Sequence, residues 1–450
     1  MLTILLGLLG LGLIVFIHEL GHYIACRICG VTVEAFSIGM GPVLLHKKIG
    51  ATDYRLSLIP LGGYCAMKGQ KDFQIALDEK LEAIKGEPDS YYGVHALKRI
   101  LICAAGPVFN MVFACLAFAV ISMIGYTYYT TPAKIILANE VYPDIQSSAQ
   151  QAGLETGDRI LSIGGKKVSY FSDISEIVTL SADETLEFVV ERNGEILTYF
   201  IPVQLDTSTG AGKIGVINWV TPLISHVDEN SPAHEAGLLS GDLIIKVNGS
   251  SVKNTADIQK LLTNAVSAEI TFLRHNNEHT VVLSIPSQSG DGSNPIGLQF
   301  SVLEVHSPTY SFFPALSEGI EETYRMLGVT IKSIGLLFKG VDVKKAVSGP
   351  IRITVMLGDS MKTGFAQSVS VGFVTALNFL ALISVSLFLM NLLPIPILDG
   401  GMILYALIEL ITRKKISPKI LYYVQFAGLA IILCIFAFAL FGDVSYLLKL

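Results

Sequence analysis

Charged residues are scarce in this chain. Only 16% of its 450 residues are Asp, Glu, Lys or Arg, whereas 51% are hydrophobic, and the mean hydropathy is +0.56. This composition excludes an ordinary soluble protein and indicates a membrane protein. The net charge of −6 is modest. Because the chain has no basic stripe, we expect no nucleic-acid partner.

Cysteine is also rare. The chain has six cysteines, and none lies between Tyr126 and Ser370, so no disulfide framework holds that region. Cys26 and Cys29 have the spacing of a metal-binding pair, but a structural zinc site takes four ligands and only Cys65 lies nearby in the sequence. We interpret them as ordinary thiols.

Four apolar segments are long enough to cross a membrane, for which about 20 residues are needed. The first lacks the basic start and the cleavage site of a secretory signal, so we predict that it is retained. The third is too long for one straight helix. The segments are Leu2–Cys26, Ile100–Gly125, Val371 to about Leu398, and Ile420–Gly442.

The loops that follow the first and third spans carry the excess of Lys and Arg. They are Arg27–Arg99 and Thr412–Lys419, and such loops face the cytoplasm. Both termini and the insert between Tyr126 and Ser370 are then expected on the outer side of the membrane, in the periplasm or its equivalent.

A single formal charge stands in the first span. Glu19 lies within His18-Glu19-Leu20-Gly21-His22. On a helix, imidazoles at i and i+4 share a face and can bind one metal ion, and the Glu between them can orient a water molecule. An ionisable group at membrane depth costs about 2.5 to 3.5 kcal/mol and is usually paired, metal-bound or functional. The pattern predicts a zinc hydrolase; the alternative is a satisfied interior His pair.

Two histidines do not complete a catalytic zinc site, which takes three protein ligands and keeps one position open. The best candidate for the third ligand is Asp399, an intramembrane carboxylate that follows Pro394 and Pro396. Prolines break a helix, and broken backbone at membrane depth is tolerated where it lines a wet cavity. The alternative is a capping Asp near the membrane interface. The motif lies about 24 Å along the first helix, at 1.5 Å per residue, and hence toward the cytoplasmic side.

The loop after the first span predicts a β-hairpin. Residues Val33–Pro42 and Tyr54–Tyr64 read as strands bounded by Gly and Pro turns. The edge of such a hairpin could pair with an extended peptide, and a purely structural hairpin is the alternative. Further along, Pro314–Gly340 has apolar residues at helical spacing and predicts an amphipathic helix at the membrane interface.

The outer insert contains a repeat. Ala152-Gly153-Leu154-Glu155-Thr156-Gly157-Asp158 returns 84 residues later as Ala236-Gly237-Leu238-Leu239-Ser240-Gly241-Asp242. The signature predicts a short helix, a turn capped by glycine and an apolar strand in each copy. It resembles the PDZ domain in the circularly permuted form of bacterial proteases. Such modules could bind peptide or protein ligands or could exclude bulky substrates, and their place between the second and third spans favours exclusion.

The whole pattern resembles the site-2 protease family, on His18 to His22, on the run from Asn391 to Gly400, and on four spans with two PDZ modules between them. The resemblance implies a zinc endopeptidase that cleaves single-span proteins within the bilayer, such as an anti-sigma factor or remnant signal peptides. It implies that His18, His22 and Asp399 bind zinc and that Glu19 is the base. It also implies that the hairpin engages substrate, at Gly39, Gly41, Gly62 and Gly63. Asn391 matches a position that handles substrate or orients the site, and a polar cap at the helix break is the alternative.

The predicted fold is thus a polytopic α-helical membrane protein with four transmembrane helices, a membrane-associated β-hairpin and two tandem β-rich PDZ domains between the second and third helices. A scaffold without catalysis is the main alternative, and the intact Glu19 argues against it. A transporter is disfavoured because the second and fourth spans hold no ionisable group. The expected domains are 1–125 (two helices and the hairpin), 126–219 and 220–302 (PDZ), 303–370 (amphipathic) and 371–450 (two helices).

Overall fold

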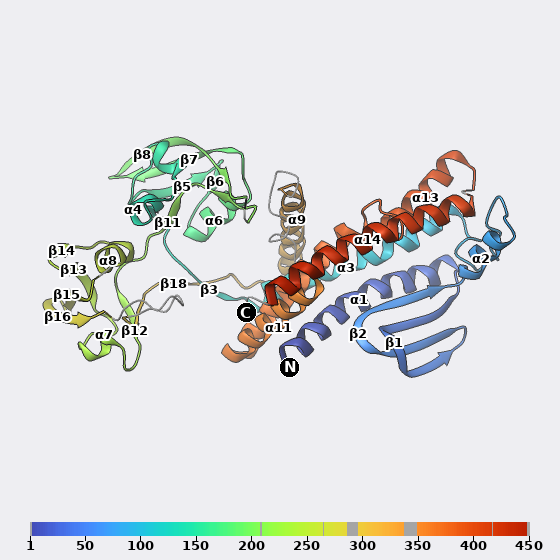
Figure 1. Ribbon diagram of the computed structural model, residues 1–450, viewed down its shortest axis with the longest axis horizontal. Coiled ribbons are helices and arrows are strands. Elements are labelled where there is room, and N and C mark those ends of the chain that lie inside the picture. Colours follow the sequence, from blue (N-terminus) through green and yellow to red (C-terminus); the bar gives the residue numbers. More distant parts are fainter. Residues whose placement is uncertain are drawn as a thin grey trace. The chain divides into compact units, whose positions relative to one another are not determined.

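The computed structural model describes residues 2–207, 209–263, 265–285, 296–336, 349–415 and 417–447. Its contacts divide into two compact units. One holds the residues up to Tyr126 together with most of those after His306, and the other runs from Thr127 to His306 (Figure 1). We call them the helical unit and the β unit.

Among the residues that the structure describes, four helices of the helical unit are long and apolar enough to cross a membrane. They contain few charges and are apolar on all sides, as expected of helices that face lipid. Helices α1, α3 and α12 pack against one another. The four are α1 Leu2–Cys29, α3 Ala96–Ile124, α12 Val369–Asn391 and α14 Pro418–Leu447.

The third span is shorter than the sequence suggested. We predicted a segment reaching about Leu398, but α12 ends at Asn391, and a separate helix, α13 Asp399–Thr412, begins eight residues later. Pro394 and Pro396 cause the break, because proline has no backbone N–H and its ring clashes with the preceding turn.

Besides α13, three shorter or amphipathic helices occur among the described residues of the helical unit. Two of them, α2 Gln70–Asp78 and α11 Pro350–Gln367, were not predicted. Helix α9 Phe312–Leu336 confirms the predicted amphipathic helix over its described length, since Ala315, Gly319 and Thr323 are buried while Phe313 is 80% exposed. The predicted end of that helix, 337–340, lies outside the described residues.

A buried carboxylate fixes the start of α11. Asp443 of α14 is 1% exposed and accepts hydrogen bonds from the backbone N–H groups of Gly349 and Ile351 at 2.8 and 2.9 Å. It therefore caps the first turn of α11 from another helix, where a negative charge complements the unpaired N–H groups.

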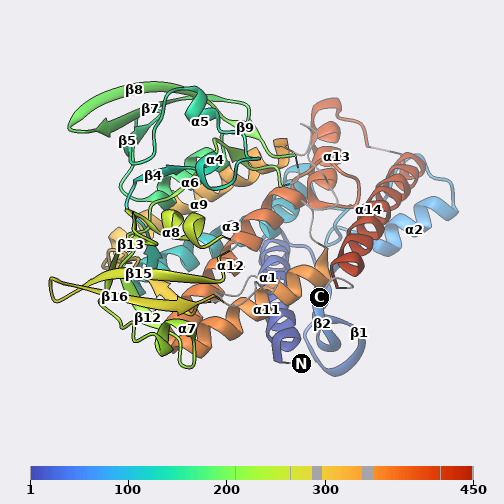
Figure 2. The ribbon, with the colours of Figure 1, turned by 60° about the vertical axis from the view of Figure 1, so that its left-hand side comes forward.

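The predicted hairpin is confirmed and is longer than expected, with strands β1 Val33–Ile49 and β2 Thr52–Met67. Each strand bends, so that residues 33–38 pair both with 63–67 and with 53–56, while 43–49 pair with 52–57. The bends lie at Gly39, Gly41 and Gly62, whose φ angles are +85°, +83° and +91°. Residues other than glycine rarely adopt such positive φ angles. The hairpin packs along α1 in both views (Figure 2).

The β unit contains two copies of one arrangement. Sheet order β6-β5-β7-β8 recurs as β14-β13-β15-β16, and each copy has its own hydrophobic core, around Phe188 in the first and around Phe272 in the second. The short helix, glycine turn and strand predicted from the repeat are present in both copies.

The elements of the first copy, in chain order, are β3 Thr127–Thr130, β4 Ile135–Leu137, α4 Ala138–Val141, α5 Ser148–Gln151, β5 Arg159–Ile163, β6 Lys166–Lys167, α6 Phe171–Thr179, β7 Thr185–Arg192, β8 Glu195–Pro202, β9 Gln204–Leu205, β10 Gly212–Lys213 and β11 Val216–Asn218. The rest of the unit comprises β12 Ile224–Val227, α7 Pro232–Glu235, β13 Leu243–Val247, β14 Ser250–Ser251, α8 Thr255–Leu262, β15 Ser267–Arg274, β16 Asn277–Ser284, β17 Leu298–Phe300 and β18 Leu303–His306. Strand β18 pairs with β3, so the start of the expected 303–370 segment lies in the β unit.

The Asp of each repeat signature is held by an arginine. Arg192 binds Asp158 through two hydrogen bonds of 2.7 Å, and Arg274 binds Asp242 in the same way. Both carboxylates are 1% exposed. In the second copy burial alone would raise the pKa of Asp242, but the hydrogen bonds from Arg274 and from the backbone of Leu239, with the nearby positive charge, together lower that pKa. The pair closes the glycine turn onto the sheet.

We expect Arg192→Met to destabilise the first copy by about 3 kcal/mol, because it leaves a buried carboxylate without its cation. The matched control is Arg159→Met, which removes an exposed partner of Glu191 and should cost less than about 1 kcal/mol. Urea unfolding of the full chain can be followed by the fluorescence of Trp219, the only tryptophan in the sequence. Equal unfolding midpoints for the two variants would contradict this account.

Candidate metal centre

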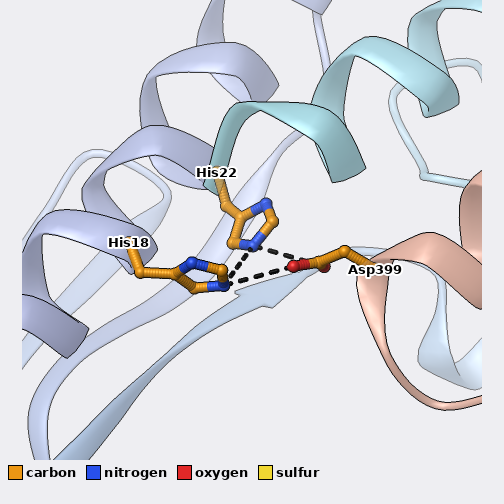
Figure 3. A group of neighbouring side chains, drawn as sticks. All are labelled: His18, His22 and Asp399. Carbon is orange, nitrogen blue, oxygen red and sulfur yellow. Dashed lines mark hydrogen bonds and ion pairs between the residues drawn. The ribbon is translucent and has the colours of Figure 1, made fainter. Parts of the chain in front are cut away.

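The two histidines of the motif project from one face of α1, as their spacing predicted (Figure 3). Their Nε2 atoms lie 3.2 Å apart. His22 is buried, with 5% of its surface exposed. The helix therefore presents two nitrogen donors toward a common point in a largely enclosed place.

Asp399 reaches the same point from the other end of the chain. It is the first residue of α13. Gly400 and Gly401 let this helix start close to the preceding loop, because a Cβ on either would lie 2.3 Å from the carbonyl oxygen of Leu392 or Ile395. The loop also holds Ile397 at a φ of +88°, a conformation that β-branched residues seldom adopt.

The three side chains converge tightly. The Asp399 carboxylate lies 3.2 Å from His18 Nε2 and 3.4 Å from His22 Nε2. Donor atoms bound tetrahedrally to zinc at about 2.0 to 2.1 Å stand about 3.4 Å apart. Among the residues that the structure describes, no other group of three His, Cys, Asp or Glu side chains comes this close. The donor set and its spacing fit a catalytic zinc ion.

Helix α3 orients both imidazoles. The Nδ1–H of His22 donates to the carbonyl oxygen of Ile102 at 2.8 Å, which leaves Nε2 free to bind a metal. Asn110 is fully buried, and its amide lies 3.3 Å from His18 Nδ1 while its Oδ1 has no partner among the described atoms. Rotating this amide by 180° lets Oδ1 accept the Nδ1–H of His18, the arrangement that a metal-bound His requires.

Asn110 was not among the residues predicted from the sequence. It lies in an apolar span with Gly106 four residues before it, and an amide at membrane depth is itself a signal of function or pairing. The sequence did not indicate its partner, because His18 is 92 residues away.

Because Gly106 has no side chain, it leaves space for the two imidazoles. A Cβ on Gly106 would lie 2.3 Å from His22 Nε2 and 2.8 Å from His18 Cε1. We expect Gly106→Ala to lower cleavage at least about 100-fold, since a misplacement of 1 Å can cost that much, and to weaken zinc binding. The control is Gly328→Ala in α9, where a Cβ meets nothing within 4 Å. Zinc content and cleavage equal to those of the control would contradict the expectation.

Glu19 lies where α1 meets the hairpin. A Cβ on Gly63 would stand 3.5 Å from Glu19 Cγ, and the backbone of Cys65 faces the Glu19 carboxylate closely enough to interact with it. Of the four glycines assigned to substrate binding, Gly63 alone is thus next to Glu19, whereas the other three form the bends of the hairpin. Asn391 ends α12, eight residues before Asp399.

A cavity of about 750 Å³ adjoins Asp399. It is lined by polar and apolar groups, among them Cys65, Cys103, Tyr92 and Gln425. Burial raises the pKa of Tyr92 to about 12, so its hydroxyl stays neutral and can donate a hydrogen bond. The cavity is large enough for water and for an extended segment of peptide.

Comparison with known proteins identifies the family. The pattern that describes peptidase family M50 matches residues 6–435. The chain belongs to peptidase family M50. This M50 peptidase is 42% identical, over 99% of its length and 100% of the relative's, to a protein of Treponema pallidum (strain Nichols) named as a zinc metalloprotease. It is 29% identical, over 98% of both chains, to the regulator of sigma-E protease RseP of Escherichia coli (strain K12).

Membership of this family decides between the protease, the scaffold and the transporter, which the sequence left as alternatives. M50 peptidases are the site-2 proteases, so the chain is a zinc metalloprotease of the membrane and its cofactor is Zn²⁺. Four apolar helices and relatives of the RseP type make it a multi-pass membrane protein that acts on membrane-protein substrates within the bilayer. The scaffold and transporter alternatives are therefore excluded as its main function.

Proposed function

We propose that this M50 peptidase cleaves single-span membrane proteins within their transmembrane segment, with His18, His22 and Asp399 as the zinc ligands. The observation that carries the proposal is the convergence of two imidazoles of a membrane-spanning helix with the carboxylate that begins α13. The two Nε2 atoms lie 3.2 Å apart, and each lies 3.2 or 3.4 Å from an oxygen of Asp399. Zinc bound there supplies a Lewis acid that polarises the scissile carbonyl and acidifies water.

Glu19 takes the role of general base in this proposal. Its carboxylate accepts a proton from the attacking water and returns it to the leaving nitrogen, as a positioned carboxylate does in metalloproteases. Ile102 and Asn110 hold the imidazoles with their Nε2 atoms toward the metal. With zinc bound, the two carboxylates of Asp399 and Glu19 balance the divalent charge, which makes the site tolerable in a low-dielectric interior.

The hairpin is proposed to hold the substrate extended. A helical substrate hides its carbonyls in hydrogen bonds and must unwind before attack. Residues 63–67 pair with 33–38 on one side, and no described strand pairs with their other side. Since Gly63 and Cys65 lie next to Glu19, a peptide added at this edge would run past the base. Asn391 is proposed to contact the same substrate.

We also propose that 126–219 and 220–302 are PDZ domains that exclude bulky substrates, on the outer side of a bacterial cytoplasmic membrane, with the zinc nearer the cytoplasmic side. The excess of Lys and Arg in the two loops supports this orientation. The repeated sheet order and the repeated Asp–Arg pair support a common module. The substrate we favour is an anti-sigma factor of an envelope-stress response, and remnant signal peptides are further candidate substrates.

The test is to map the products from a tagged single-span peptide by mass spectrometry. Peptide and protein are combined in detergent and compared with a sample treated with a zinc chelator. We expect one or a few chelator-sensitive cuts within the apolar segment. Cuts confined to the flanking polar residues would refute intramembrane cleavage while leaving the zinc site untouched.

A further inference from the structure

A buried ion pair joins the start of α3 to the end of α13. Arg99 Nη2 lies 2.7 Å from Glu409 Oε2, and the two side chains are 9% and 18% exposed. Taking two charges out of water costs about as much as their attraction returns, so a buried pair is weak support for stability. A better-attested use of such groups is to specify one relative position of two elements.

Helix α3 is also the helix that orients both histidines. Arg99, Ile102, Gly106 and Asn110 follow one another at spacings of three, four and four residues, so they share a face of α3. Ile102 accepts from His22, Asn110 lies against His18, and Gly106 leaves space for both rings. Arg99 is the residue of this face that forms an ion pair with α13, while Ile102 packs in one hydrophobic cluster with Met402 and Ile403 of α13.

Helix α13 needs a reference of its own, because it does not continue α12. The residues between Asn391 and Asp399 are not helical, and although Gly400 packs against Leu392 at the end of α12, the far end of α13 is not held by α12. Glu409 lies ten residues after Asp399, about 15 Å along the helix at 1.5 Å per residue. The two helices pack against each other, and Asp399 and Glu409 are the only charged residues of α13.

We infer that Arg99 and Glu409 are positioning residues that set α13 on α3 and so hold the Asp399 carboxylate at the two imidazoles. This inference rests on the proposed role of Asp399 as a zinc ligand. The ion pair fixes one end of α13 on α3, and the bound metal fixes the other end. All three ligands are then positioned against the same face of α3. Loss of the pair leaves the fold in place and loosens the third ligand.

The surroundings of the pair decide which variants are informative. Lys415 and Tyr405 line the same small cavity as Arg99 and Glu409. After a substitution of Arg99 alone, Lys415 can become the partner of Glu409, and a buried charge without a partner can unfold the protein. Replacing both residues with apolar ones, Arg99→Met with Glu409→Leu, removes the tether and leaves no orphan charge.

The experiment measures the rate at which purified, zinc-loaded protein in detergent releases zinc to a colorimetric chelator, together with the thermal midpoint of the metal-free protein. The double variant should release zinc about 10- to 100-fold faster, as expected when an outer-shell support of a ligand is lost. Its metal-free midpoint should match wild type, and its cleavage should show a lower kcat at unchanged KM. The control pair, Lys246→Met with Glu278→Leu, removes an exposed ion pair of the β unit and should behave as wild type.

Release within twofold of wild type would overturn the inference, and so would a faster release matched by a lower metal-free midpoint. If the double variant does not fold, variants that reverse the two charges test the inference instead. Glu409→Arg alone should release zinc at least about tenfold faster than wild type, and adding Arg99→Glu should restore the wild-type release rate. Glu409→Arg alone within twofold of wild type would overturn the inference. Asp399→Asn is run in parallel. If Asp399→Asn and the Arg99 and Glu409 variants all release zinc at the wild-type rate, the ligand assignment itself has failed. If Asp399→Asn releases zinc faster and the Arg99 and Glu409 variants do not, only the positioning role has failed.

Discussion

Replacement of Glu19 by Gln is expected to leave zinc bound and to reduce cleavage about 100- to 10,000-fold, the usual contribution of a positioned general base. Gln has the shape of Glu and can keep the contact with the backbone of Cys65. It cannot accept a proton from water. The three donor atoms of His18, His22 and Asp399 do not include Glu19, so the metal content should remain that of wild type.

The measurement is cleavage of a single-span substrate in detergent, with zinc determined on the same preparation. Glu82→Gln is the matched control, because Glu82 is exposed in the loop between α2 and α3 and its loss should change neither value. Substantial cleavage by Glu19→Gln would show that another group is the base. A loss of zinc with the loss of cleavage would show that Glu19 is a ligand.

Asp399→Ala should remove zinc. Two imidazoles whose Nε2 atoms lie 3.2 Å apart remain, but the site loses its only anionic donor. The affinity should fall by more than the roughly 10- to 100-fold that follows loss of an outer-shell partner, and cleavage should fall with it. Dialysis against a buffered range of free zinc gives the affinity.

Asp144→Ala is the control, since Asp144 is exposed in the β unit. Restoration of cleavage to Asp399→Ala by a large excess of zinc would support the assignment, because it separates a lost ligand from a damaged fold. Zinc binding by Asp399→Ala as tight as that of wild type would refute it.

Local patterns in the sequence predicted much of the fold. A charge-free run of spanning length predicts a helix wherever it occurs, and the spacing of His18 and His22 places both rings on one face whatever surrounds them. Pro394 and Pro396 indicated a break in the third apolar segment, although not that α12 ends at Asn391. The bends at Gly39 and Gly62 lie inside the two predicted strands and were not predicted. Asp399 could be singled out because a carboxylate is conspicuous in an apolar segment.

Contacts between distant segments could not be predicted. Nothing near Asn110 or Gly106 in the sequence indicates that they touch imidazoles of α1, and Arg99 and Glu409 are 310 positions apart. Helix α11 was missed because its cap comes from Asp443, on a helix 94 residues after Gly349. The repeat revealed Asp158 and Asp242, but their arginine partners follow 34 and 32 residues later, too far for a local motif.

A zinc titration of metal-free protein, with cleavage of a single-span substrate followed at every addition, tests the central claim most directly. One site held by His18, His22 and Asp399 predicts that cleavage rises linearly and stops rising at one zinc ion per chain. Glu19→Gln should bind zinc with the same end point and show almost no cleavage. Cleavage by the metal-free protein, or a rise that continues to two zinc ions per chain, would contradict the account.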